Sequence, residues 1–177
     1  DYAASDSEET EANTNLLYRL SLDGTSSGAV RVEGEPFDQF SLSESENELS
    51  VFITAYHETS NSGYRSYEFY EVDQALVRVP VSDFDENGTE VSADRYLLMP
   101  DHDIYKARFH NNHLVYGGYE SIGVVDLESG NITQLDSPFY TYRIEPAGDR
   151  VMIFGSDNWG WDPSLSMASI SLGQDGS

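Results

Sequence analysis

The chain of 177 residues contains no cysteine and only one lysine, Lys106. Without cysteine it can form no disulfide, no thiolate metal site and no thiol nucleophile. Lysine and arginine together number 9 against 32 aspartates and glutamates, which leaves a formal net charge of -23 at pH 7. Nucleic-acid binding needs cationic groups that displace counterions from phosphates, so this composition argues against a nucleic-acid partner.

Long apolar runs and helical patterns are also missing. No segment approaches the roughly 18 apolar residues that a membrane-spanning helix needs. No window places apolar residues at i, i+3, i+4 and i+7 over three turns, so long amphipathic helices are not expected. Residues 1–15, DYAASDSEETEANTN, are polar and acidic. They are predicted to be a disordered spacer, either behind a removed export signal or lipid anchor or at an arbitrary boundary.

The chain nevertheless has enough apolar material for a folded core. Its residues are 38% hydrophobic and 12% aromatic, which is too rich for a disordered protein. High acidity with little lysine is typical of proteins from salt-loving or marine organisms, where salt screens the self-repulsion of the charge. An ordinary acidic exported protein is the alternative. We therefore expect an exported location (extracellular, cell-surface or periplasmic), or else the cytoplasm of a halophile.

A unit of short alternating strands and tight turns recurs about every 45 residues. The clearest copy runs from Ile104 to Pro138 and reads IYKARFHN, HLVYGGY, SIGVVDLESG and NITQLDSP. Such a repeat predicts an all-β fold, namely a β-propeller segment of about three to four antiparallel blades with four strands each.

The repeat divides the chain into four blades or part-blades. They cover residues 16–36 (partial), 37–100, 104–138 and 140–172 (partial). In the second blade, residues 38–45 are predicted to form the first strand and Thr89–Met99 the last, with an insertion from about Tyr56 to Tyr70. These strands do not close a ring, so we expect the remaining blades in another part of the parent protein or in another chain.

Three runs carry a family resemblance: FDQFSLSESENELSVFITAY, ALVRVPVSDFDENGTEV and IYKARFHNNHLVYGGYESIGVVDLESG. They resemble exported bacterial and archaeal proteins with a C-terminal β-propeller distantly related to WD repeats. The resemblance extends from Leu16 to Leu172, although the Trp-Asp dipeptide at the end of the third strand is not present. It implies an exported, many-bladed propeller and carries over no catalytic motif.

The links between blades share one face of a propeller with the loops that join the second and third strands of each blade. Exposed aromatic rings beside carboxylates on this face suit recognition of a glycan or of a partner protein. In the alternative interpretation, the tryptophans pin their own loop and the tyrosine-rich insertion is an extended hairpin. The candidate ligand-binding residues are Tyr56, Tyr64, Tyr67, Asp101, His102, Asp103, Trp159 and Trp161.

The segment SDFDENGTEVSAD has the spacing of a calcium loop. Asp83, Asp85 and Asn87 alternate ahead of Gly88, an arrangement that directs three oxygens inward before a glycine turn. Asp94 occupies the twelfth position, where glutamate is usual. A structural calcium ion bound by Asp83, Asp85, Asn87 and Asp94 is therefore one prediction. The other is an acidic hairpin whose Asn-Gly pair makes the turn.

The histidines give weaker metal signals. His102 lies between two aspartates, but alternation along a strand turns it away from Asp101 and Asp103, so a polar loop is favoured. His110 and His113 in the turn HNNH have no carboxylates beside them in sequence.

We predict a non-catalytic exported module that binds a protein or a glycan. The alternative is a carbohydrate-active hydrolase or lyase, with acid and base carboxylates drawn from Asp38, Asp101 and Glu120 at the end of the propeller channel. A purely structural domain within a larger surface protein is a third possibility.

Overall fold

The computed structural model describes residues 14–24, 27–45, 47–59, 69–100, 103–119, 121–157 and 164–173. Within these ranges the elements are β-strands and two single-turn 3-10 helices, η1 (Val81–Asp83) and η2 (Ala93–Arg95). The prediction of an all-β fold is confirmed. Neither helix in this part of the chain is long or apolar enough to cross a membrane.

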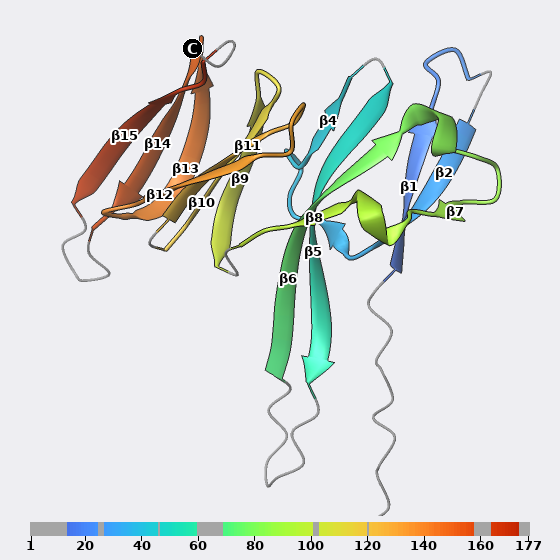
Figure 1. The fold of residues 1–177 in the computed structure, drawn as a ribbon, viewed down its shortest axis with the longest axis horizontal. Coiled ribbons are helices and arrows are strands. Elements are labelled where there is room, and N and C mark those ends of the chain that lie inside the picture. The colour runs from blue at the N-terminus through green and yellow to red at the C-terminus, as the bar shows by residue number, and fades with distance from the viewer. Residues whose placement is uncertain are drawn as a thin grey trace, which may run out of the picture.

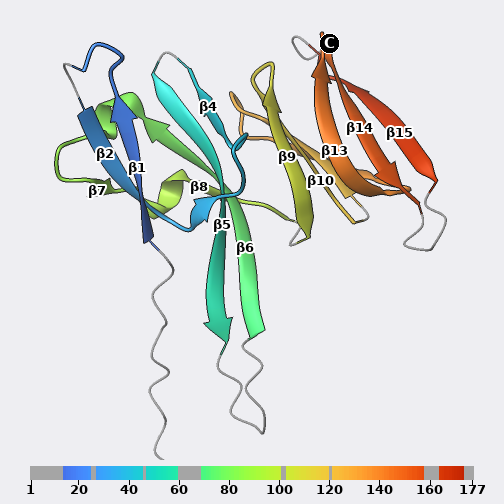
Figure 2. The same ribbon diagram turned by 180° about the vertical axis from the view of Figure 1, so that it is seen from behind.

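Four β-sheets lie in a row, as Figures 1 and 2 show from opposite sides. The first sheet contains β1 (Thr14–Leu20), β2 (Ser27–Glu33) and β7 (Thr89–Glu90). The second contains β3 (Glu35–Pro36), β4 (Leu42–Glu44), β5 (Glu48–Thr59), β6 (Phe69–Pro80) and β8 (Tyr96–Leu98). The third contains β9 (Ile104–His110), β10 (His113–Gly118), β11 (Ser121–Asp126) and β12 (Ile132–Asp136). The fourth contains β13 (Tyr140–Ala147), β14 (Arg150–Ser156) and β15 (Leu165–Ser171).

Neighbouring strands are antiparallel throughout the second, third and fourth sheets. In the third sheet the spatial order follows the chain from β9 to β12, and in the fourth from β13 to β15. The described strands form open sheets and close neither a barrel nor a ring. The propeller therefore stays a prediction.

A hydrophobic core lies between each sheet and the next, built from residues of both. Strand β5 contributes to two of them, because Val51 and Ile53 face the first sheet while Phe52 faces the third. Strand β10 does the same, with Leu114 in the core toward the second sheet and Val115 in the core toward the fourth. A strand that is buried on both faces has a continuous apolar run in its sequence rather than an alternating pattern. This explains the segment VFITA, residues 51–55, in β5.

The fourth strand of the second blade differs from the prediction over Thr89–Met99. Thr89 and Glu90 form β7, which pairs in parallel with β2 of the first sheet, and the Val91 N–H donates to the Arg31 carbonyl at 2.9 Å. After the turn at η2, only β8 pairs with β6. Alternation predicts that a segment is extended but does not specify its neighbour, so one predicted strand divides between two sheets. The predicted first strand at 38–45 is likewise shorter. Within these residues only β4 forms a strand, which pairs with β5.

Strands β5 and β6 form a long hairpin, paired from Glu48 with Pro80 to Thr59 with Phe69. Their distal ends project beyond the neighbouring sheets (Figures 1 and 2). The predicted insertion begins on this projecting ladder, and its residues 60–68 lie outside the described part of the chain.

Candidate functional site: a tyrosine surface beside a cleft

Three tyrosines from the third and fourth sheets surround a fourth, Tyr140. The ring centroid of Tyr140 lies 4.9 Å from that of Tyr105, 5.0 Å from that of Tyr142 and 6.0 Å from that of Tyr119. Tyr105, Tyr119 and Tyr142 are 38%, 45% and 48% exposed. We call Tyr105, Tyr119, Tyr140 and Tyr142 the tyrosine surface. Tilted and edge-on aromatic pairs at these distances stabilise each other, so the rings form one coherent apolar surface open to solvent.

The segment between β12 and β13 holds Tyr140 in place. Phe139 is only 5% exposed and packs in the core between the third and fourth sheets. The Ser137 hydroxyl donates to the Phe139 carbonyl at 2.6 Å. Gly155 on β14 permits the close approach, because a Cβ there would overlap the Tyr140 carbonyl and the Phe139 ring. The register between β13 and β14 also shifts between Thr141 and Arg143, an irregularity that re-aims side chains.

Gln74 positions the start of β9, which carries Tyr105. Its buried side chain accepts from the Ile104 N–H at 3.2 Å and donates to the Ile104 carbonyl at 3.1 Å. On the other side, Gly118 of β10 leaves room for the Asp103 carbonyl, which a Cβ would overlap. Two sheets thus fix the backbone of Asp103, Ile104 and Tyr105.

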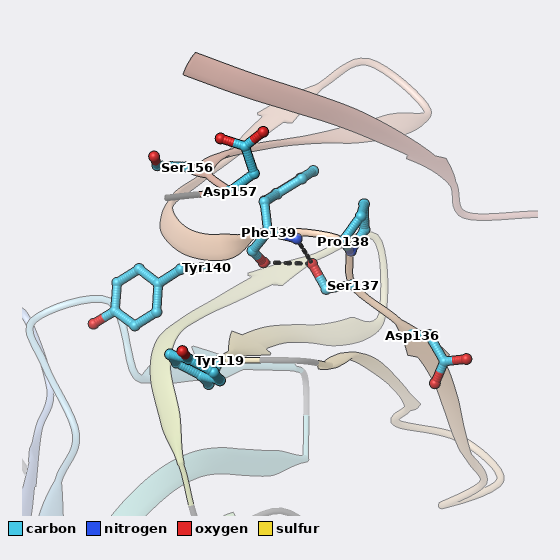
Figure 3. A pocket seen from close by; sticks show the side chains of 8 residues that line it. All are labelled: Tyr119, Asp136, Ser137, Pro138, Phe139, Tyr140, Ser156 and Asp157. Atoms are coloured by element: carbon cyan, nitrogen blue, oxygen red, sulfur yellow. Dashed lines mark hydrogen bonds between the residues drawn. The ribbon is translucent and has the colours of Figure 1, made fainter. Parts of the chain in front are cut away.

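A cleft of about 380 Å³ adjoins the tyrosine surface. The rings of Tyr119 and Tyr140 lie at one side of this cleft, and the carboxylates of Asp136 and Asp157 lie at different edges (Figure 3). The remaining lining residues are Ser137, Pro138, Phe139 and Ser156. The volume falls within the range of small-molecule sites, which combine apolar walls with a few polar groups.

The electrostatic character of the site is acidic. Asp103, Asp136 and Asp157 are all exposed. Burial raises the pKa of Tyr140, and the neighbouring phenols of Tyr105 and Tyr142 raise it further. The Tyr140 phenol therefore stays a neutral hydrogen-bond donor and acceptor at physiological pH.

The structure describes only two of the eight predicted ligand-binding residues. Asp103 directly precedes β9 beside Tyr105, while Tyr56 lies on β5 of the second sheet, opposite Val72, and is 42% exposed. The other six lie outside the described residues: Tyr64, Tyr67, Asp101, His102, Trp159 and Trp161.

None of the four tyrosines of the tyrosine surface belonged to the predicted set. One signal could have found two of them: Tyr105 is the second residue of β9 and Tyr140 the first residue of β13, so both lie at the start of the opening strands of consecutive units. Equivalent positions in neighbouring repeats lie side by side when repeats stack.

The predicted calcium loop folds as a turn closed by Asp85. The Asp85 carboxylate accepts from the backbone N–H of Asn87 at 2.8 Å and of Thr89 at 3.3 Å, and also from the Thr89 hydroxyl. The Thr89 hydroxyl, followed by the Asn87 N–H, lowers the pKa of Asp85. These bonds are those of an Asx turn.

Three of the four predicted calcium ligands share a second cleft of about 430 Å³. Asp83, Asp85 and Asp94 line it together with Glu90 and Arg95. The Ser92 hydroxyl lowers the pKa of Asp94. Among the described residues, no group of three or more acidic, histidine or cysteine side chains is placed to hold a metal ion. Calcium binding stays a prediction.

The remaining predicted polar residues that are described take part in turns. The Asp38 carboxylate accepts from the Phe40 N–H at 2.7 Å and the Ser41 hydroxyl at 2.8 Å. His110 Nε2 lies 2.7 Å from the Gly148 carbonyl oxygen, which joins the third sheet to the fourth. His113 Nε2 lies 3.6 Å from the Asp126 carboxylate. Asp101 and Glu120, the other candidate catalytic carboxylates, lie outside the described residues.

No family model, curated protein or solved structure matches the chain. The resemblance to exported propeller proteins therefore stays a prediction.

Proposed function

We propose that the chain is a non-catalytic binding module of the propeller type that recognises a neutral glycan through its tyrosine surface. The observation that carries this proposal is the meeting of four tyrosines beside a cleft of about 380 Å³ with carboxylates at its edges. The C–H faces of a pyranose ring are apolar and pack on aromatic rings. Its hydroxyl groups donate to carboxylates such as Asp136 and Asp157.

Charge narrows the class of glycan. A net charge of -23 repels anions approaching the site, and exposed Asp136 and Asp157 add local negative charge. Uronic acids and sulfated sugars are therefore poor ligands. Neutral sugars meet no such barrier.

Two observations favour binding over hydrolysis. Glycoside hydrolysis uses two carboxyl groups that flank the same bond, one of them in a buried or closely paired setting. Asp103, Asp136 and Asp157 are exposed, and Asp136 and Asp157 lie at different edges of the cleft (Figure 3). Residues Gly24–Gly28 fit the pattern Gly-x-Ser-x-Gly of serine hydrolases. They connect two strands, β1 and β2, whereas the nucleophile elbow of those enzymes joins a strand to a helix.

The propeller interpretation rests on the repeated packing. Three successive cores lie between four sheets, and the first strands of the third and fourth sheets, β9 and β13, lie next to each other. Propeller blades pack face to face in this manner. An exported location accords with the resemblance to exported propeller proteins.

A glycan array tests the proposal. The labelled chain is expected to bind neutral oligosaccharides and to ignore uronic and sulfated ones in about 0.15 M salt. Tyr119→Ala and Tyr140→Ala are expected to weaken binding about tenfold, the loss of roughly 1.4 kcal/mol typical of an aromatic anchor. Leu98→Ala, at an exposed position of β8 outside both proposed binding surfaces, is the control and is expected to bind normally. Equal binding by all three variants, or a preference for acidic glycans, would contradict the proposal.

A further inference from the structure

In the described part of the chain, no other sheet packs on one face of the fourth sheet. Along β14, Val151 and Ile153 are buried in the core shared with the third sheet. Met152 and Phe154 alternate with them and therefore point to the opposite face. On β15, Leu165 and Met167 are 78% and 61% exposed and pair with Ser156 and Phe154. We call Met152, Phe154, Leu165 and Met167 the outer face of the fourth sheet.

This outer face is hollowed and apolar. A cleft of about 460 Å³ opens on it, lined by Tyr142, Arg143, Glu145, Met152, Phe154 and Leu165. Its volume is sufficient for a large aromatic side chain from a partner. An exposed apolar area of this kind indicates an interaction surface.

The first sheet has a corresponding face at the other end of the row (Figures 1 and 2). On β1, Leu17 is buried toward the second sheet, whereas Leu16, Tyr18 and Leu20 alternate with it and are 42%, 69% and 70% exposed. We call Leu16, Tyr18 and Leu20 the outer face of the first sheet. One chain thus carries two apolar sheet faces, one at each end of the same row.

The outer face of the fourth sheet is less acidic than the molecule as a whole. Arg143 and Arg150 are exposed at its edges, beside two acidic residues: Asp149 directly precedes Arg150, and Glu145 accepts from Arg143 at 2.6 Å. Only 9 residues in the whole chain are basic, against 32 acidic ones. An acidic partner is therefore repelled less here than an average part of this acidic surface would repel it, and a second copy of the chain is such a partner.

We propose that the outer face of the fourth sheet binds the outer face of the first sheet of a second copy. The contact repeats the sheet-on-sheet packing that already occurs three times within the chain. Because it joins two different faces, it is head-to-tail and leaves one free face of each kind on every pair of copies. Tyr18 of one copy is the side chain suited to the cleft of the other. This proposal does not depend on glycan binding.

Salt controls the association. Two copies with a charge of -23 each repel one another, and the screening length falls from about 10 Å at about 0.1 M salt to about 3 Å at about 1 M. Sedimentation of the whole chain is therefore expected to change from monomer to dimer or larger species between these two concentrations.

Paired variants test which faces meet. Leu165→Glu with Met167→Glu alters the fourth sheet, and Tyr18→Glu with Leu20→Glu alters the first. Each pair is expected to raise the apparent dissociation constant more than tenfold. The control Leu98→Glu with Leu135→Glu adds the same charge at exposed positions of β8 and β12 and is expected to associate like the unmodified chain. The milder pair Leu165→Ser with Met167→Ser separates the loss of contact from the added charge.

Mixing the two altered chains gives the decisive result. Each retains the face that the other has lost, so a head-to-tail contact predicts a one-to-one pair that grows no further. This recovery also demonstrates that both variants are folded. The proposal is wrong if the first-sheet variant still associates on its own, because the fourth-sheet faces would then bind each other. The proposal is also wrong if the chain stays monomeric at about 1 M salt. Another partner, or another part of the chain itself, would then cover the two outer faces.

Discussion

At the residue scale, Gln74 shows how a buried polar side chain can join two sheets. It is 5% exposed and makes two hydrogen bonds to the backbone of Ile104, which is 4% exposed. A glutamine amide offers both a donor and an acceptor, so one side chain satisfies a buried N–H and a buried carbonyl. The tyrosine surface depends on this contact because Tyr105 follows Ile104 directly.

Gln74→Ala is therefore expected to be strongly destabilising. It leaves two buried backbone groups without partners, each costing about 1–3 kcal/mol, so we expect a loss of about 2–4 kcal/mol. Urea unfolding measures this loss. Gln39→Ala, at an exposed position, is the control and should stay within about 0.5 kcal/mol of the original chain. Equal stability of the two variants would mean that Gln74 does not join the sheets.

Asp126 is expected to make stability depend on pH in the acid range. Its carboxylate accepts from the Ser129 N–H at 2.7 Å, the Ser129 hydroxyl at 2.9 Å and the Glu128 N–H at 3.0 Å. The Ser129 bonds are the main reason that its pKa falls below the ordinary value of 3.8. A carboxyl with a lowered pKa in the folded state adds stability above pH 3.8, and this stability disappears as the pH falls through the lowered pKa.

Asp126→Asn is accordingly expected to be less stable than the original chain above about pH 5, with a difference that shrinks as the pH drops below 3.8. Thermal unfolding at a series of pH values measures the difference. Ser129→Ala should reduce the pH dependence only in part, because the Ser129 backbone N–H remains. A gap between Asp126→Asn and the original chain that widens toward low pH would refute the assigned direction of the shift.

The candidate site was less predictable from the sequence than the core. The buried positions Val51, Phe52 and Leu114 follow from apolar patterning alone. The tyrosine surface combines side chains from β9, the end of β10 and β13, and local alternation does not reveal which segments converge. Its geometry also depends on the register shift near Thr141, which no turn signal in the sequence marks.

At the element scale, the long hairpin of β5 and β6 has a part packed between the sheets and a projecting part on which the predicted insertion begins. Its buried residues lie between Ser50 and Ala55 on β5 and between Gln74 and Val79 on β6. The pairs beyond Tyr56 and Val72 lie on the projecting ladder (Figure 1). Burial of apolar surface dominates the stability of a strand pair, so the core portion should be independent of the projection.

Replacing residues 57–71 with Asn-Gly tests this separation, because Tyr56 and Val72 are directly paired and Asn-Gly closes a two-residue hairpin. We expect the melting temperature to change by only a few degrees, within about 1 kcal/mol. Glycan binding should persist. If the folded variant lost glycan binding, the binding site would instead include the removed segment, which contains Tyr64 and Tyr67.

The strands themselves followed from alternation and turn residues. The third sheet matches its unit closely, since Asn111 and Asn112 adopt the left-handed conformation with φ of 46° and 58°, which the tight turn HNNH requires. Residues 89–98 were less predictable, because β7 and β8 each contain only two or three residues. Strands this short carry too little pattern to specify their neighbours.

At the scale of the whole molecule, the net charge of -23 should oppose folding at low salt. Self-repulsion destabilises a compact state, and salt screens it. We expect the melting temperature to rise steadily between about 0.01 M and about 1 M sodium chloride. Calorimetry at low protein concentration, where association is negligible, measures the rise. A melting temperature that falls or stays constant would contradict the account of charge.

The central claim is that the tyrosine surface binds a neutral glycan without altering it. Isothermal titration of the strongest neutral oligosaccharide from the array, with product analysis of the same solution, tests it most directly. The account predicts saturable binding, about tenfold weaker for Tyr140→Ala, and recovery of the intact oligosaccharide. Cleavage products, or identical affinity for Tyr140→Ala and the original chain, would contradict it.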